Sequence, residues 1–333
     1  MQTTRRQFHF RALGLAAASL GIPAIGRAQA AAYPSRPIRL IVPYAAGGGP
    51  DVMTRKMALT LADTLGKATV VVENIVGAGG ILAAQEVARM APDGYNLITG
   101  ASTHVVQKAM QPSVKFDPLK DFTHITLTSF SPLMLVVSAA SPFRTIDDLV
   151  AAIRKEPGKF NYASGGVGSG AHLCGASFAV EAKLDVVHVP YKGSVEIVPS
   201  LLSGATHFAF PVASTAIPQV QSGKVRALAV TSAKRMPAFP NVPTLVETFK
   251  TDDLALDAWG GVWGPAGMAP EVVDVLFKAF TRVYNTPSVR ADADAAGAVI
   301  QLSQSPAEFR RFMEVETRKF AKIVKDANLT TIG

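Results

Sequence analysis

The chain has 333 residues, 48% of them hydrophobic and 17% charged, against about 25% charged residues in an average globular protein. This composition excludes a disordered chain and requires a large core, for which two domains of ordinary size are expected. The formal net charge of +8 falls to +4 without residues 1–30, which hold four arginines and no acid. No long basic run remains, so the sequence predicts no nucleic-acid partner.

The cysteine and histidine content shows no metal-binding pattern. The single cysteine, Cys174, excludes an internal disulfide, a four-cysteine zinc site and an iron–sulfur cluster. We expect it to be a small core residue. The six histidines show no H-E-x-x-H or similar spacing, and we expect neither a metal nor a cofactor.

Residues 1–30 are typical of an export signal. Arg5 and Arg6 precede an apolar stretch, Ala12–Ile25, which the small-x-small site Ala28-Gln29-Ala30 follows. The segment Thr4–Phe8 resembles the twin-arginine export motif. The apolar stretch is shorter than the roughly 20 residues that cross a bilayer, so cleavage near Ala30 is expected to release the mature chain into the periplasm.

After the signal, short β-branched runs alternate with glycine turns and helical periodicity, the pattern of an α/β fold. The first series of predicted elements has strands at 38–42, 70–72 and 95–98, helices at 52–65 and 81–90, and turns at 47–51, 77–80 and 100–103. The second has strands at 133–138, 159–163, 185–189, 206–210, 225–231 and 258–263, helices at 146–154 and 171–182, a turn at 164–170 and a short helix containing Pro199. Two longer helices, at 271–284 and 306–327, complete the chain.

The order of these elements predicts two lobes, because one strand leaves the first series and another returns to it. Lobe 1 is expected to comprise residues 31–131 and 240–333, and lobe 2 residues 132–239. Such an arrangement creates a cleft between the lobes. In open α/β sheets ligands bind at the carboxyl ends of the strands, where the glycine turns of this chain fall.

Three strand–turn–helix junctions carry these glycines: Gly47–Asp51, Gly77–Gly80 and Ser164–His172. A helix N-terminus offers free backbone N–H groups to an anion, and glycine lets the main chain approach a ligand closely. A single junction of this kind can simply close a tight loop. Three of them, distributed over both lobes, favour a ligand with two anionic ends.

An enzyme on the same scaffold is the alternative. The run Gly166–Ala171 fits the G-x-G-x-x-A dinucleotide fingerprint, but no acid follows the next strand to bind a ribose hydroxyl. Ser169 and His172 could face each other as in a serine enzyme, yet no G-x-S-x-G elbow surrounds Ser169. We assign no catalytic residue, and an NAD-dependent or serine-dependent enzyme is kept as the second hypothesis.

Three further residues have a structural and a functional interpretation. His188 lies in a strand of valines, which favours a structural histidine. Trp259 and Trp263 flank two glycines on a late strand, so either core packing or a wall of the cleft is expected.

A series of motifs follows the signal in a fixed order. They are Tyr33-Pro34-Ser35-Arg36-Pro37-Ile38, Ile41-Val42-Pro43-Tyr44 with Gly47-Gly48-Gly49, Val72-Glu73-Asn74 with Gly77-Ala78-Gly79-Gly80, Ala91-Pro92-Asp93-Gly94-Tyr95, Tyr162-Ala163-Ser164, His188-Val189-Pro190-Tyr191-Lys192-Gly193 and Arg226-Ala227-Leu228-Ala229-Val230-Thr231. Together they resemble the periplasmic solute-binding proteins of tripartite tricarboxylate transporters, the Bug family. The resemblance implies a monomer with a two-lobed type II periplasmic binding fold, without enzymatic activity, that delivers a small carboxylate to a membrane permease.

The resemblance also implies a set of ligand-binding residues. Tyr44, Gly48, Gly49, Gly79 and Gly80 are expected at one carboxylate, and Ser164, Gly165, Gly168, Ser169 and His172 at the other. Ser102 and Thr103, at the end of the third strand, and the apolar pair Pro211 and Val212 complete the predicted site.

Two departures from the family pattern bear on the ligand. Val167 stands where members often have asparagine, and Pro211-Val212 where they often have Asp-Asn. The lost acid removes the natural partner of a ligand ammonium group. We therefore expect an ammonium-free dicarboxylate with an aromatic or aliphatic body.

Overall fold

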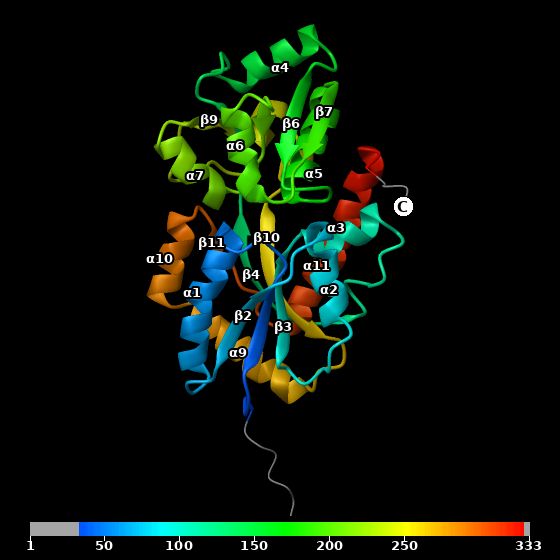
Figure 1. Cartoon of the computed structure of the whole chain (residues 1–333), viewed down its shortest axis with the longest axis vertical. Helices are drawn as coiled ribbons and strands as arrows, with labels where there is room; N and C mark the ends of the chain where they lie inside the picture. Colours follow the sequence, from blue (N-terminus) through cyan, green and yellow to red (C-terminus); the bar gives the residue numbers. More distant parts are fainter. Residues whose placement is uncertain (1–32, 330–333) are drawn as a thin grey trace, which may run out of the picture. The chain divides into compact units, whose positions relative to one another are not determined.

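The computed structural model describes residues 33–329, which form two β-sheets with helices around them (Figure 1). The predicted two-lobed α/β class is therefore confirmed. The six-stranded sheet and its helices form lobe 1, and the five-stranded sheet and its helices form lobe 2. The predicted export signal lies outside the described residues.

The sheet of lobe 1 has the strand order β11-β4-β10-β3-β1-β2. Its strands are β1 (Ile38–Val42), β2 (Val70–Asn74), β3 (Asn96–Ala101), β4 (Phe122–Ser131), β10 (Ala258–Pro265) and β11 (Val299–Ile300). Strand β1 pairs in parallel with β2 and β3, whereas β10 pairs antiparallel with β3 and β4. The carboxyl ends of β1, β2 and β3 therefore meet at one edge.

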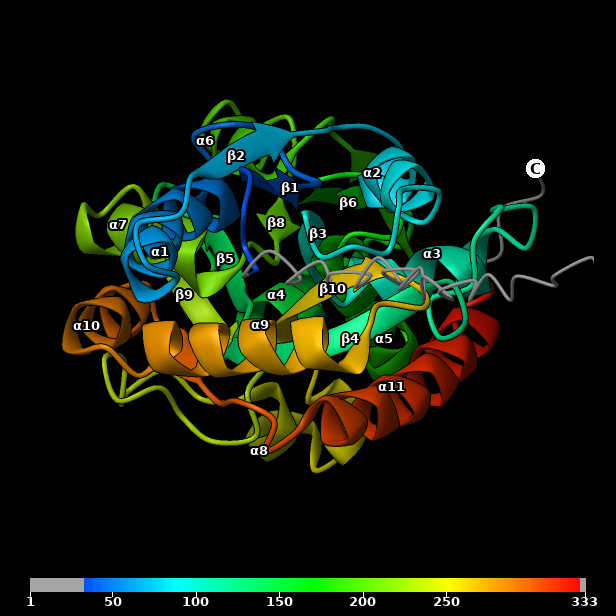
Figure 2. The same ribbon diagram turned by 90° about the horizontal axis from the view of Figure 1, so that it is seen from below.

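Helices cover both faces of this sheet, because its central strands bury alternate residues on opposite sides. Leu40 and Leu97 pack with α1 (Gly49–Thr64), α9 (Pro270–Tyr284) and α10 (Pro287–Ala295). Ile41 and Ile98 pack with α2 (Ile81–Val87), α3 (Thr103–Met110) and α11 (Pro306–Asp326). Figure 2 shows the outcome, with α9 beside α1 and α11 beside α3.

The sheet of lobe 2 has the strand order β7-β6-β8-β5-β9. Its strands are β5 (Met134–Ser138), β6 (Phe160–Ser164), β7 (Val186–Pro190), β8 (Phe208–Ala209) and β9 (Val225–Val230). The surrounding helices are α4 (Ile146–Lys155), α5 (Gly170–Ala182), α6 (Ile197–Leu202), α7 (Ala213–Gln221) and α8 (Leu245–Phe249). Within residues 33–329 there are also three short 3₁₀ helices: η1 (Ala78–Gly80), η2 (Ser194–Glu196) and η3 (Asp252–Leu254). Strands β6, β7 and β8 run in parallel, so their carboxyl ends also share an edge.

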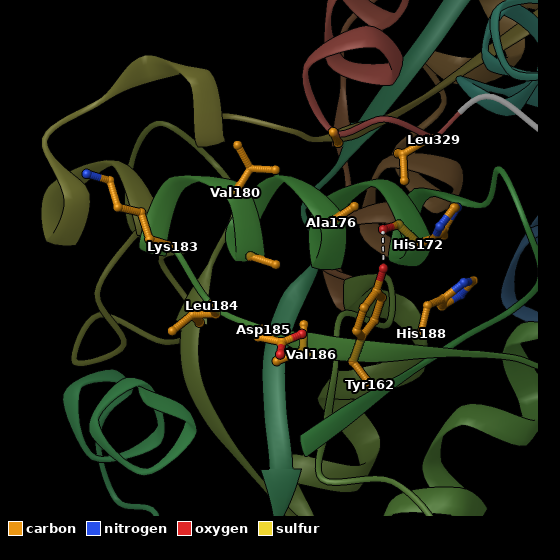
Figure 3. A pocket seen from close by; sticks show the side chains of 12 residues that line it. Tyr162, His172, Ala176, Val180, Lys183, Leu184, Asp185, Val186, His188 and Leu329 are labelled. Atoms are coloured by element: carbon orange, nitrogen blue, oxygen red, sulfur yellow. Dashed lines mark hydrogen bonds between the residues drawn. The ribbon is translucent and has the colours of Figure 1, made fainter. Parts of the chain in front are cut away.

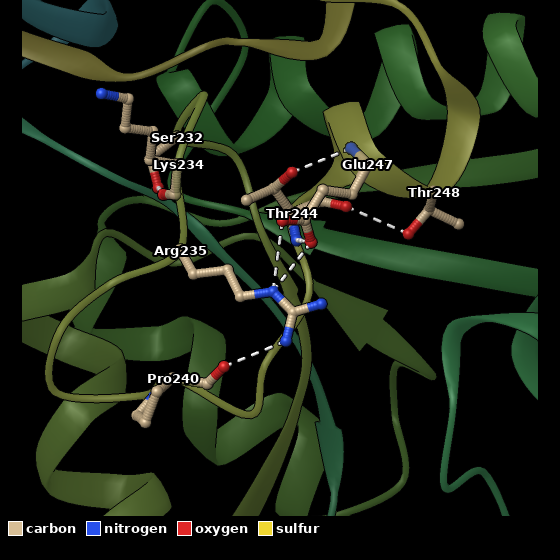
Figure 4. Close-up of polar contacts among 7 residues, drawn as sticks. All are labelled: Ser232, Lys234, Arg235, Pro240, Thr244, Glu247 and Thr248. Carbon is tan, nitrogen blue, oxygen red and sulfur yellow. Dashed lines mark hydrogen bonds and ion pairs between the residues drawn. The ribbon is translucent and has the colours of Figure 1, made fainter.

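The segment after β9 stays attached to lobe 2, since the Val230 N–H at the end of β9 donates to the Pro243 carbonyl at 2.9 Å. Side-chain contacts within the segment hold it in shape (Figure 4). The Arg235 Nε donates to Glu247 Oε2 at 2.9 Å, and its Nη1 donates to the Pro240 carbonyl at 3.0 Å. Leu245 and Leu254 are buried in the core of lobe 2. These contacts favour a return to lobe 1 near residue 257, whereas the boundary expected from the sequence was 240, and the exact domain bounds stay a prediction.

The sequence patterns did not indicate α3, β4, α7, α8, α10 or β11. The alternation of apolar and polar residues does not identify strand β4, because its polar residues His124, Thr126 and Thr128 are buried rather than facing water. Helix α7 contains Pro218, which normally argues against a helix interior. In both elements, tertiary packing overrides the local signal.

We predict that Phe178→Ala lowers the free energy of unfolding by about 3–5 kcal/mol, because it leaves a cavity in the core of lobe 2. Phe178 has no exposed surface and packs against Phe208 and Phe210. Leu59→Ala is the matched control, since Leu59 is 74% exposed, and is expected to change stability by less than about 0.5 kcal/mol. Urea denaturation of both variants measures the difference, and similar losses would contradict the assigned core.

Candidate ligand site

A cavity of about 320 Å³ lies between the carboxyl ends of the strands of both sheets. From lobe 1 it is lined by the segments after β1, β2 and β3, and from lobe 2 by the segments after β6, β7 and β8. The last residues of β4 and the first of β10, the strands next to the two crossings, line it as well. The position agrees with the general rule for ligand sites in open α/β sheets.

Four helices of eight or more residues begin at this cavity: α1, α3, α5 and α7. The residues Gly48, Ser102 and Val212, which precede α1, α3 and α7, make no side-chain capping bond. The N–H groups of a first helical turn have no partner within the helix, and the helix dipole makes this end positive. The cavity therefore suits an anion at more than one place.

Charged side chains are nearly absent from the lining. Among residues 33–329, Lys192 is the one charged residue at the cavity. Asp51 does not line it, because its carboxylate accepts hydrogen bonds from the Gly47 N–H, Arg55 and Asn74. Burial raises the pKa of Asp51, but these hydrogen bonds outweigh burial and lower the pKa overall.

The Asp51 carboxylate also fixes the turn between β1 and α1. Asn74 Nδ2 donates both to Asp51 Oδ1, at 2.9 Å, and to the Tyr44 carbonyl, at 3.0 Å. The hydroxyl groups of Tyr44 and Thr103 lie 3.1 Å apart at the cavity. A glycine-rich turn is thereby held in one conformation without charge on its cavity side.

Ser169 stands at the start of α5 and has two roles open to its hydroxyl group. The Oγ accepts a hydrogen bond from the His172 N–H at 3.3 Å, which caps the helix. Ser169 also lines the cavity. A hydroxyl group that accepts in this way still has its own proton to donate to a ligand.

The structure brings most of the sequence-predicted residues together at this cavity. Eleven of them line it: Tyr44, Gly48, Gly49, Gly79, Gly80, Ser102, Thr103, Gly165, Ser169, Pro211 and Val212. Ser164, Gly168 and His172 do not, and neither does Val167. Ser164 has no exposed surface, and its Oγ is bonded to the Gly166 N–H at 3.1 Å and to His188 Nε2 at 2.6 Å.

His172 and His188 lie behind the turn that follows β6, in a separate groove between α5 and β7 (Figure 3). Their rings stack with centroids 3.9 Å apart. His172 Nδ1 accepts from the Gly168 N–H at 3.1 Å, and His188 Nε2 bonds Ser164 Oγ. The two rings therefore brace the turn from its far side, and His172 contacts the loop rather than lining the cavity.

The structure adds residues that the sequence patterns did not select. Lys192 follows β7 in the same way that the glycine turns follow their strands, and this position could have identified it. Thr128 and Ser129 come from β4, which had no recognisable strand pattern. Both tryptophans lie in the core of lobe 1, and Trp259 also lines the cavity and donates from Nε1 to Glu316 Oε2 at 2.7 Å.

The fold and the site define a class. Two α/β lobes with an anion-suited cavity between their strand ends are the construction of a periplasmic solute-binding protein, and this chain is such a protein rather than an enzyme.

Within residues 33–329 no group of three or more His, Cys, Asp or Glu side chains could hold a metal ion. In the same residues, the helices are all too short or too polar to span a membrane.

Residues 53–329 match the tripartite tricarboxylate transporter family receptor, and the chain belongs to that family. It is 32% identical over 316 residues to the protein BugT of Bordetella pertussis strain Tohama I, covering 94% of this chain and 95% of BugT. The family assignment made from the ordered motifs is therefore confirmed.

Solved structures agree with this assignment. The periplasmic binding protein BugD superimposes with a TM-score of 0.83 at 30% identity, over 90% of this chain and 99% of BugD. An R. palustris protein with adipate gives 0.82 at 28% identity, over 89% and 98% of the two chains. MatC from Rhodopseudomonas palustris with bound malate gives 0.81 at 28% identity, over 88% and 100%.

Acid is predicted to destabilise the protein through His172. Burial lowers the pKa of His172 to about 4, whereas an unfolded histidine titrates near 6.5. The stability of the neutral, folded form is complete above pH 6.5 and is lost as the pH falls toward 4, with a slope of up to about 1.4 kcal/mol per pH unit. Urea titrations between pH 7 and 4 measure it.

The control for this prediction is His172→Asn, which keeps an acceptor near the Gly168 N–H but does not titrate. Burial also lowers the pKa of His104, His124 and His188, so the wild-type profile contains all four contributions. The variant should show a shallower loss of stability than the wild type. Identical slopes would contradict a neutral buried His172.

Proposed function

We propose that the protein captures an ammonium-free dicarboxylate in the cavity and delivers it to the membrane permease of a tripartite tricarboxylate transporter. The observation that carries this proposal is the lining itself, to which residues 33–329 contribute four helix N-termini, one lysine and no acidic side chain. Backbone N–H groups and a cation complement carboxylates. The chain's family supports the permease as partner and the periplasm as location.

One carboxylate of the ligand is assigned to lobe 1. Gly48 and Gly49 at the start of α1, and Gly79 and Gly80 after β2, approach the cavity without side chains. Gly79 and Gly80 have φ values of 63° and 96°, which L-residues with a side chain rarely adopt. The turn can therefore present its main chain directly to the ligand.

The second carboxylate is assigned to lobe 2. Ser169, Gly170 and Ala171 at the start of α5 line the cavity, and Lys192 lies after the neighbouring strand β7. A hydrogen bond from the Ser169 hydroxyl group adds to the N–H groups of the first helical turn. The turn after β6 would be held in place on the side away from the cavity by Ser164, Gly168 and His172.

The segment after β8 argues against a ligand amino group. Pro211 and Val212, which precede α7, offer no charge and no side-chain hydrogen bond. Asp257 accepts a hydrogen bond from Thr231, and neither residue lines the cavity. An ammonium group in this space would be desolvated without a partner, which costs several kcal/mol in effective terms.

Two structural relatives support the ligand class. One was solved with adipate and the other with malate, and both acids carry two carboxylates and no amino group. Their backbones match this chain over nearly its whole described length. For this protein we propose the same class of ligand, a dicarboxylate without an amino group, but neither of these two acids in particular. We expect the protein to work as a monomer.

We predict that aspartate and glutamate bind at least a hundredfold more weakly than the best ammonium-free dicarboxylate, because no acidic side chain of residues 33–329 lines the cavity to pair with the amino group. A thermal-shift screen of aliphatic and aromatic diacids identifies that ligand, since a hundredfold excess over Kd stabilises the native state by about 2.7 kcal/mol. Competition calorimetry then compares it with both amino acids. Displacement by aspartate at equal concentration would refute the proposed selectivity.

Ser169→Ala is predicted to weaken dicarboxylate binding by about tenfold or more, since a hydrogen bond to a charged group contributes about 1.5–3 kcal/mol. The substitution also removes a helix cap, worth about 1 kcal/mol of stability. Ser305→Ala separates the two effects, because Ser305 caps α11 by accepting from the Glu308 N–H at 3.1 Å and does not line the cavity. Calorimetry should show weaker binding for Ser169→Ala only, and wild-type affinity there would remove Ser169 from the site.

A further inference from the structure

Gln107 connects the two lobes at the ligand-binding turns. It lies on α3 of lobe 1, and its Nε2 donates to the Gly79 carbonyl at 3.2 Å and to the Val167 carbonyl at 3.4 Å. Gly79 belongs to the turn after β2, and Val167 to the turn after β6 in lobe 2. One amide group therefore bonds two turns that grip the ligand from opposite lobes.

The orientation of this amide follows from its surroundings. Two carbonyl oxygens face it, and only an NH₂ group can donate to both, so the nitrogen must point toward the turns. The Oε1 atom is buried and has no hydrogen-bond partner among residues 33–329. Gln107 itself is only 1% exposed.

Packing alone does not account for a glutamine at this position. An unpaired buried acceptor destabilises a protein, and an apolar side chain of similar length would remove this cost. The gain from the amide comes from its two donated bonds, one of which reaches into the other lobe. The side chain is therefore better suited to joining the lobes than to stabilising lobe 1.

The two turns are shaped to fit this amide. A Cβ atom at Gly79 would overlap Gln107 Nε2, and one at Gly168 would lie 2.7 Å from the same nitrogen. Both glycines have positive φ, 63° and 79°. The absence of side chains on both turns thus lets the backbones of the two lobes close on one side chain.

We propose that Gln107 is an interlobe latch, a positioning residue that holds the turn after β2 and the turn after β6 together when the cavity is closed. Both bonds can exist only while the two turns meet, so opening of the cleft breaks at least the bond to Val167. The latch does not contact the ligand, since Gln107 does not line the cavity. It acts on the ligand by stabilising the closed arrangement, and in this respect it rests on the proposed function.

The test uses Gln107→Met, which keeps the length of the side chain and removes both donors, and Gln107→Glu, which keeps the shape and places oxygens opposite the two carbonyls. Each variant should raise the Kd of the best dicarboxylate from the thermal-shift screen by roughly 2- to 13-fold, the range expected for the one neutral hydrogen bond that joins the lobes, since the bond to Gly79 lies within lobe 1. The increase should lie mainly in koff, because the ligand can leave only after the lobes have parted. Gln221→Met, an exposed position at the end of α7, is the control and should bind like the wild type.

A second measurement reads the closed arrangement without any ligand. Spin labels at Leu59→Cys on α1 and Leu202→Cys on α6, both exposed, report the interlobe distance, and the buried Cys174 stays unlabelled. In the ligand-free protein, Gln107→Met should shift the distance distribution toward longer values. Unchanged distances together with unchanged koff would overturn the latch. If no dicarboxylate binds the wild type, the proposed function fails, but the ligand-free distances still decide whether Gln107 joins the lobes.

Discussion

The candidate site depends on backbone N–H groups at helix starts. Helices α1, α3, α5 and α7 begin at one cavity, and three of them lack a side-chain cap. These N–H groups lose water when a cavity closes and need an acceptor in its place. A dicarboxylate ligand would offer two acceptor oxygens at each of its two ends. The glycine turns, the parallel strand ends and a lining with Lys192 as its one charged residue among residues 33–329 are all consistent with bringing main-chain donors to a ligand.

Two sets of side-chain contacts, one in each lobe, keep these N–H donors in place. In lobe 1, Asp51 and Asn74 tie the turn after β1 to the end of β2. In lobe 2, Ser164 and the stacked histidines hold the turn after β6. Glycine-rich turns have high conformational freedom in the unfolded state, so a site built from them needs such supports to be formed before the ligand arrives.

Much of this arrangement was predictable from local sequence, and the remainder was not. Glycine turns directly after β-branched runs identified Gly48, Gly79 and Ser169 at the cavity. Strand β4 and helix α3 were missed, because buried polar residues such as Thr126 erase the apolar pattern on which the prediction depends. Gln107 could not be found for the same reason, and because its partners are 28 and 60 residues away in the chain. Long-range pairing of that kind leaves no trace in local periodicity.

The outer strands of the two sheets have a consequence for how copies of the chain meet. At one edge of the first sheet, β11 has only two residues, and in lobe 2 the outer strand β7 ends in Pro190, which has no N–H to donate. On the other side of lobe 2, β9 is partly occupied by a bridge from Val230 to Thr244. Exposed strand edges are templates for intermolecular pairing, and short, proline-ended or occupied edges discourage it. Three of the four outer strands in residues 33–329 therefore discourage edge-to-edge pairing, and β2 is the remaining open edge.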